Sequence, residues 1–144
     1  MWVQNVLDIH SNNSEVLFFV KNNKKIRNKK VLSQLSFELS VPIEFQKSKE
    51  EWQSEQCKQW GCIGIHKNSC VKFKKRNHVR YEFKTKQFAP IIWLIKVSKL
   101  EKYKNITFEL LSICGEKKGF INIKEGIIVC FKELETKIKF CFCK

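Results

Sequence analysis

The side chains with the clearest chemical potential in this sequence are basic. Residues 21–30 hold six basic side chains and no acidic one, and residues 67–86 form a second basic region in which Glu82 is the one acid. Clustered lysine and arginine neutralise phosphate groups and are also typical of nuclear import signals. The two regions predict contact with a nucleic acid, with solvated loops between strands as the alternative.

The last eight residues combine positive charge with sulfur. Alternate side chains of a strand share one face, so Phe140 and Phe142 are expected to face the core. Lys139, Cys141 and Cys143 would then line the opposite face together. A lysine beside two small thiols suits close approach to a phosphate and a base edge. The alternative is a strand whose cysteines pack as small hydrophobic groups under a loop.

Cysteine and histidine supply the candidate metal ligands. Cys57, Cys62, His66 and Cys70 could form a local site, because tetrahedral zinc accepts this ligand set. Their spacing matches no common zinc module, which favours unligated thiols. The chain has seven cysteines, and an odd number without a recognisable secretory signal favours reduced thiols in the nucleus or the cytoplasm.

An enzymatic function is not expected. His10, His66 and His78 are the only histidines, and none lies in a recognisable nucleophile or metal-hydrolase motif. Cys62 and His66 could be read as a thiol and its base, but such a pair at short spacing is usually incidental.

Length and charge limit the architecture and the partners. With 144 residues and 43% hydrophobic content, the chain can build one core and is too short for two domains of normal size. We predict a single basic domain over residues 1–144, with residues 1–28 only loosely assigned. The net charge of +14 favours polyanionic partners, and a lysine-rich codon bias is the alternative. No run approaches the roughly 20 apolar residues of a membrane span.

Hydrophobic periodicity predicts an all-β fold, an immunoglobulin-like antiparallel β-sandwich. Alternating or continuous apolar patterns predict strands at residues 36–45, 79–83, 91–97, 106–113, 127–131 and 137–143. The runs 91–97 and 127–131 are typical of central strands buried on both faces. Pro42 cannot donate to a sheet ladder, so the first strand needs an edge or a bulge there.

One short surface helix is expected after Ser48. Ser48 and Glu51 have the spacing of a capping box, and Trp52 and Trp60 lie two turns apart in a polar segment. The same spacing at residues 98–101 predicts either a turn or a short helix.

Several segments together resemble one known family. Residues 29–35 and 42–45 read Lys-Lys-Val-Leu-Ser-Gln-Leu and Pro-Ile-Glu-Phe, similar to that family's Lys-Lys-Leu-Tyr-Cys-Gln-Ile and Pro-Ile-Gln-Ile. Residues 79–88, 91–97, 106–114 and 127–135 follow in the family's order. Lys139 stands two residues before the Cys141 and Cys143 pair, where the family has an arginine. Residues 29–144 thus resemble the DNA-binding domain of the tumour-suppressor p-fifty-three transcription factors.

This resemblance implies a nuclear transcription factor that binds double-stranded DNA with some sequence preference. The implied DNA contacts are Lys21, Lys24, Lys25, Lys124, Lys139 and Cys143. The first three would lie in the loop that reaches the major groove, and Lys124 would replace a minor-groove arginine. Lys139 would contact phosphate and Cys143 a base edge. Lysine lacks the planar fork of arginine, which implies weaker sequence discrimination.

The family's zinc site is incomplete in this chain. The family binds zinc through a Cys-X-X-His pair and a Cys-X-X-X-Cys pair. Cys114 fits the first cysteine of the later pair, but Lys118 replaces the second, and Cys62 and His66 are one residue too far apart. Cys62, His66 and Cys114 are therefore the zinc ligands that the resemblance implies, with a metal-free protein as the alternative. The sequence also ends where the family's major-groove helix would begin, which argues against direct base readout.

Three functions follow from these patterns. The first is sequence-preferring binding of double-stranded DNA in the nucleus. The second is binding of RNA or other polyanions without sequence preference, and the third is a protein-interaction sandwich whose charge is compositional. No membrane partner is expected, and self-association is expected only on DNA or through segments absent from this chain.

Overall fold

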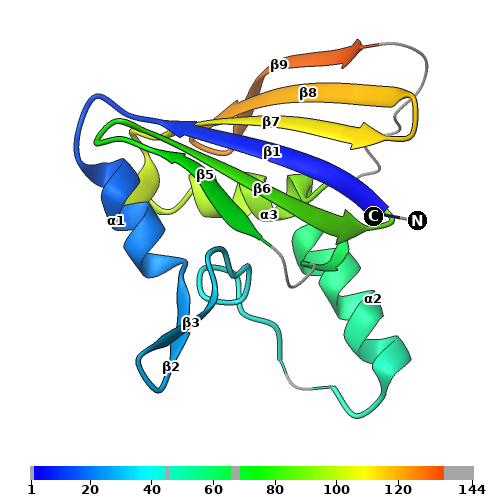
Figure 1. The fold of residues 1–144 in the computed structure, drawn as a ribbon. Helices are drawn as coiled ribbons and strands as arrows, with labels where there is room; N and C mark the ends of the chain where they lie inside the picture. Colours follow the sequence, from blue (N-terminus) through cyan, green and yellow to red (C-terminus); the bar gives the residue numbers. More distant parts are fainter. Residues whose placement is uncertain (1, 45, 66–68, 135–144) are drawn as a thin grey trace.

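The computed structural model describes residues 2–44, 46–65 and 69–134 (Figure 1). The protein is mostly β, with one large antiparallel sheet and short helices, which confirms the predicted fold class. The strands of the sheet are β1 (Trp2–His10), β4 (Ile63–Ile65), β5 (Cys70–Lys74), β6 (His78–Lys86), β7 (Thr107–Cys114), β8 (Lys117–Lys124) and β9 (Ile127–Leu134). A separate ribbon contains β2 (Lys25–Arg27) and β3 (Lys30–Ser33), and the helices are α1 (Glu15–Asn22), α2 (Lys49–Trp60), α3 (Ile91–Ser98) and the 3-10 helix η1 (Glu101–Tyr103).

The N-terminal strand β1 lies at the centre of the sheet. The strand order is β4-β6-β1-β7-β8-β9, β5 also pairs with β6, and every pairing is antiparallel. β1 pairs with β6 from Trp2 opposite Lys86 to His10 opposite His78, and with β7 on its other side. The first ten residues therefore join two segments that follow much later in the chain.

The two faces of the sheet have different environments. Along β1 the buried side chains of Val3, Leu7 and Ile9 alternate with half-exposed ones, as the period of a strand requires. In Figure 1 α1 and α3 lie on the same side of the sheet. We call that side the covered face and the other side the open face. The layer packed against the covered face is thus helical, joined by the segment around Phe37.

Aromatic side chains fill the space between the helices and the covered face. The Phe19 ring of α1 lies 5.0 Å from the ring of Tyr103 and 5.5 Å from that of Phe108, in edge-to-face geometry. It also meets Tyr81 of β6 and Trp93 of α3, both at 6.3 Å. Phe19 therefore connects both helices to the sheet.

A strand was predicted at residues 36–45, of which residues 36–44 are described and form turns and irregular structure instead. The carbonyl groups of Phe37 and Val41 accept hydrogen bonds from the indole N–H groups of Trp93 and Trp60, at 3.1 and 2.9 Å. Phe37 and Val41 are buried whereas Leu39 is exposed, so the alternating apolar residues do not share one face. Hydrogen bonds to these two tryptophan side chains thus take the place of the strand pairing that was predicted for this segment.

Residues 91–97, predicted as a central strand, form helix α3. The helix begins after Pro90, whose fixed φ suits a helix start. Ile91, Leu94 and Val97 are buried at helical spacing. An apolar run of this length cannot be assigned to strand or helix by periodicity alone.

Residues 127–131 are a strand as predicted, but β9 ends the sheet instead of lying in its centre. Ile127 and Val129 are 64% and 66% exposed. No strand of the described residues pairs with the outer edge of β9. The predicted burial on both faces was therefore wrong.

Three predicted elements are confirmed. Strand β6 includes residues 79–83, and β7 covers most of residues 106–113. Helix α2 begins after Ser48, whose hydroxyl accepts the backbone N–H of Glu51 at 3.1 Å, and Gly61 ends it with a φ of 82°. Residues 101–103 form the short helix η1 that was one of two alternatives.

Helix α1 and strand β1 lie in the N-terminal part that the sequence left loosely assigned. In β1 the polar side chain of Asn5 takes a core position, which interrupts the hydrophobic alternation.

None of the helices in the described ranges is long and apolar enough to cross a membrane.

We expect Phe19→Ala to lower the free energy of unfolding by about 3–5 kcal/mol, because it removes the ring that connects the helices to the sheet. Phe18→Ala is the matched control, since Phe18 is 48% exposed on the same helix, and its cost should stay below about 1 kcal/mol. Urea unfolding of both variants measures the difference. Equal losses would show that Phe19 does not have this role.

Candidate functional site

The ribbon formed by β2 and β3 carries four basic side chains and no acidic one. Arg27 pairs with Lys30 across it and Ile26 pairs with Val31, so one face of the ribbon is basic and the other apolar. A two-residue turn, Asn28 and Lys29, joins the strands with φ values of 52° and 63°. Positive φ at both positions is the geometry of a type I′ hairpin turn. In Figure 1 the ribbon projects away from the large sheet, below α1.

The positive charge of the ribbon is exposed and uncompensated. Lys25, Arg27, Lys29 and Lys30 are all exposed, and no acidic residue occurs between Val16 and Phe37. None of the ion pairs found in the described ranges involves these four side chains. Like charges directly opposite each other in a ribbon are destabilising, so the pair of Arg27 and Lys30 gains from a bound anion.

The structure separates the residues that the sequence predicted to contact DNA. Lys21 lies in the last turn of α1, Lys24 precedes the ribbon, and Lys25 begins β2, so these three follow one another into the basic ribbon. Lys124 ends β8 and lines a depression with the two histidines His10 and His78. The two remaining predictions, Lys139 and Cys143, lie outside the described residues.

The predicted zinc ligands do not form one site. Cys62 is buried just before β4, and Cys114 ends β7. β6 and β1 lie between those strands, which separates the two cysteines by about 14 Å at the usual strand spacing. Zinc ligands must be within about 4 Å of one another, so this prediction was wrong for the cysteine pair. His66 lies outside the described residues.

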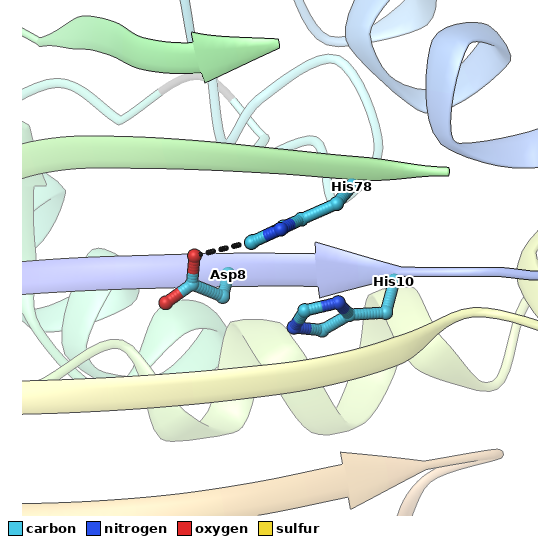
Figure 2. A group of neighbouring side chains, drawn as sticks. All are labelled: Asp8, His10 and His78. Atoms are coloured by element: carbon cyan, nitrogen blue, oxygen red, sulfur yellow. Dashed lines mark hydrogen bonds and ion pairs between the residues drawn. The ribbon is translucent and has the colours of Figure 1, made fainter. Parts of the chain in front are cut away.

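A different group of titratable side chains meets on the open face. Figure 2 shows Asp8 and His10 on β1 with His78 on the adjacent strand. The Nε2 atom of His78 lies 2.7 Å from Oδ1 of Asp8, and the rings of His10 and His78 stack with their centroids 4.0 Å apart. Arg80 donates from Nε to Oδ1 of Asp8 at 2.8 Å and from a terminal nitrogen to Oδ2 at 3.2 Å. Nε2 of His10 lies 3.6 Å from Oε1 of Glu109.

The electrostatics of this group depend on Asp8, whose side chain is 15% exposed. Partial burial acts to raise the pKa of its carboxyl. The hydrogen bonds and positive charge supplied by Arg80 and His78 together outweigh burial, and the pKa of Asp8 is lowered. The contact with Asp8 raises the pKa of Arg80 in turn. Asp8 is therefore an anion that fixes the side chains around it.

Two shallow depressions meet at His78. One has a volume of about 370 Å³ and is lined by both histidines and by polar side chains that include Asn77, Asn105 and Lys124. The other has a volume of about 570 Å³ and is lined by Phe73, Arg80 and neighbouring residues of β5 and β6. Solvent-borne groups can therefore approach the histidine pair from two sides.

Little in the sequence alone predicts this group of side chains. Asp8 and His10 are two residues apart, as are His78 and Arg80, so each pair shares a strand face. That signal was present in the alternation of both strands. The contact between the pairs depends on the register that sets His10 opposite His78, and no local pattern contains the register.

Asp8→Asn should lower the free energy of unfolding by about 1–2 kcal/mol near neutral pH, because it weakens charge-assisted hydrogen bonds to a half-exposed arginine. The folded-state pKa of Asp8 lies below its ordinary value of 3.8. Its carboxylate therefore stabilises the fold above that pH, and the contribution is lost as the pH falls through the lowered pKa.

Urea unfolding of wild type and variant at neutral and strongly acidic pH measures this dependence. The difference between them should shrink in acid. Glu101→Gln is the control, because Glu101 pairs with Lys104 on the exposed surface and should cost little at any pH. A difference that stays constant into strong acid would contradict the assignment.

No protein-family model, no curated protein and no solved structure matches this chain. Its function must therefore be argued from the geometry of the ribbon and of the open face.

Proposed function

We propose that the protein binds double-stranded DNA and that the β2–β3 ribbon enters the major groove. The observation that supports this most directly is the projecting two-stranded ribbon with four exposed cations and no acid. A location in the nucleus and a role in transcription belong to the same proposal. The resemblance to the tumour-suppressor family supports this proposal only in part, because residues 42–44 and 91–97, which belong to the resembling segments, are not strands.

The dimensions of the ribbon suit the groove. The major groove of B-DNA is about 12 Å wide and 8.5 Å deep, and it admits a two-stranded β-ribbon. The four residues of β3 span about 13 Å at the usual rise per residue, so the tip can reach the base edges.

The side chains of the ribbon divide into two roles under this proposal. Arg27 has the planar fork that can donate two hydrogen bonds to a guanine edge. Lys25, Lys29 and Lys30 lack that fork and would neutralise phosphates, as would Lys21 and Lys24 near the base of the ribbon. One residue that contacts a base edge, among several that contact phosphates, gives only a modest preference among DNA sequences.

A second candidate function is binding of single-stranded nucleic acid on the open face. Phe73 is 36% exposed there, and Nζ of Lys75 lies 4.9 Å from the centre of its ring. The register and burial patterns also place six basic side chains on this face, namely Arg80, Lys84, Lys86, Lys118, Lys124 and Lys132. Exposed aromatic rings beside cations are typical of surfaces on which unpaired bases stack.

A triple variant of the ribbon, Lys25→Ala, Arg27→Ala and Lys30→Ala, is expected to weaken binding to duplex DNA strongly. The slope of log affinity against log salt concentration should fall by about one for each lost phosphate contact. Fluorescence anisotropy with duplex and single-stranded oligonucleotides at several salt concentrations measures both quantities.

The matched control is the triple variant Lys84→Ala, Lys118→Ala and Lys132→Ala. It removes the same net charge from the open face, so the two variants differ only in where the charge is lost. Equal losses of duplex affinity would show that the charge acts only in bulk. A larger loss in the open-face variant, mainly for single strands, would favour the second candidate.

Arg27→Lys keeps the charge of the ribbon and removes its only guanidinium. We expect affinity for random duplex and its salt dependence to remain nearly unchanged, while the preference among duplex sequences falls. Competition among a library of duplexes measures that preference. An unchanged ranking of sequences would exclude base reading by Arg27.

A further inference from the structure

We propose that Asp8, His10 and His78 bind a divalent transition-metal ion, with Zn²⁺ as the best match. Two imidazoles and one carboxylate are a ligand set that suits zinc and its neighbours in the periodic table. Among the described residues, this is the one group of three or more histidine, cysteine, aspartate or glutamate side chains whose ligand atoms converge. The site is independent of the ribbon and of the DNA-binding proposal.

The strands hold the three ligands close to the geometry that a metal needs. One potential ligand atom from each side chain lies within 4.8 Å of the others. Ligand atoms around tetrahedral zinc are about 3.3 Å apart, so closure requires shifts on the order of 1 Å. His10 and His78 are directly opposite each other in the β1–β6 pair, and both side chains are partly exposed, so their rings can rotate out of the present stack to supply those shifts.

The neighbours of the ligands can serve as an outer shell. The metal would lie between Nε2 of His78 and Oδ1 of Asp8, and a neutral His78 would bind it through Nε2 while its one ring proton is on Nδ1. Oδ1 already accepts a hydrogen bond from Nε of Arg80 and would be shared with the metal, whereas the bond from Arg80 to Oδ2 would remain and orient the carboxylate. Glu109, 3.6 Å from His10, supplies a second negative charge beside the ion. The two carboxylates balance the charges of Arg80 and Lys124, the cations beside the site.

The site has room for an additional ligand. Both histidines line the depression of about 370 Å³, together with Asn77 and Lys124. Three protein ligands with one position open to solvent are typical of a zinc ion that binds water or an exchangeable anion.

The test is a titration of the full chain, free of a histidine tag and under reducing conditions, with Zn²⁺ against a chromophoric chelator. We expect one ion per chain. His78→Ala and His10→Ala should each weaken binding at least tenfold. His66→Ala is the matched control and should bind as the wild type does, because it removes the third histidine of the sequence, which is not one of the three proposed ligands.

Cobalt and circular dichroism complete the experiment. Co²⁺ bound by imidazole and carboxylate should show no thiolate charge-transfer band, whereas such a band would overturn the assignment. Loss of binding in His66→Ala or Cys62→Ala, or full retention in His78→Ala, would do the same. Circular dichroism checks that each variant folds, and His10→Gln and His78→Gln replace any alanine variant that does not. If this site does not bind metal, the expected loss of duplex binding in the ribbon triple variant still tests the DNA-binding proposal separately.

Discussion

The placement of β1 between β6 and β7 is the constraint on which the rest of the molecule depends. A buried polar network holds it there. Asn5 donates to Oγ1 of Thr85 on β6 at 2.9 Å and accepts from Oγ of Ser112 on β7 at 2.7 Å. All three side chains are buried, so an unsatisfied partner would be costly, and a shift by one residue would break every bond in the network. One amide thus fixes the register that brings residues 8–10 beside residues 78–80.

The ribbon has a different relation to the body. It belongs to a separate two-stranded sheet, and none of Lys25, Ile26, Arg27 or Val31 is part of the hydrophobic core. The hydroxyl of Ser33 at its base lies 3.2 Å from that of Ser69, which links the ribbon to the segment before β5. Changes in its charged residues should therefore have little effect on packing, whereas the open-face group is part of the sheet itself.

Sequence reasoning succeeded where local chemistry decides the structure. Helix α2 has its own start and stop signals in Ser48 and Gly61, and β6 has clear alternation. The strand predictions for residues 36–45 and 91–97 failed. The first segment is held by hydrogen bonds from indole groups distant in the sequence, and the second is a uniformly apolar run that fits a strand or a helix. The positive charge of the ribbon was visible in the sequence, but its hairpin was not, because the turn contains no glycine. The contact between Asp8 and His78 required a register between residues seventy positions apart.

The turn of the ribbon has one further consequence. Lys29 adopts a φ of 63°, in the left-handed region where a side chain with a Cβ costs on the order of 1 kcal/mol relative to glycine. Glycine would relieve that cost and would also remove a cation from the tip. Lysine at this position thus accepts a backbone conformational cost and places an ammonium group at the tip. Proteins show such a compromise where activity competes with stability.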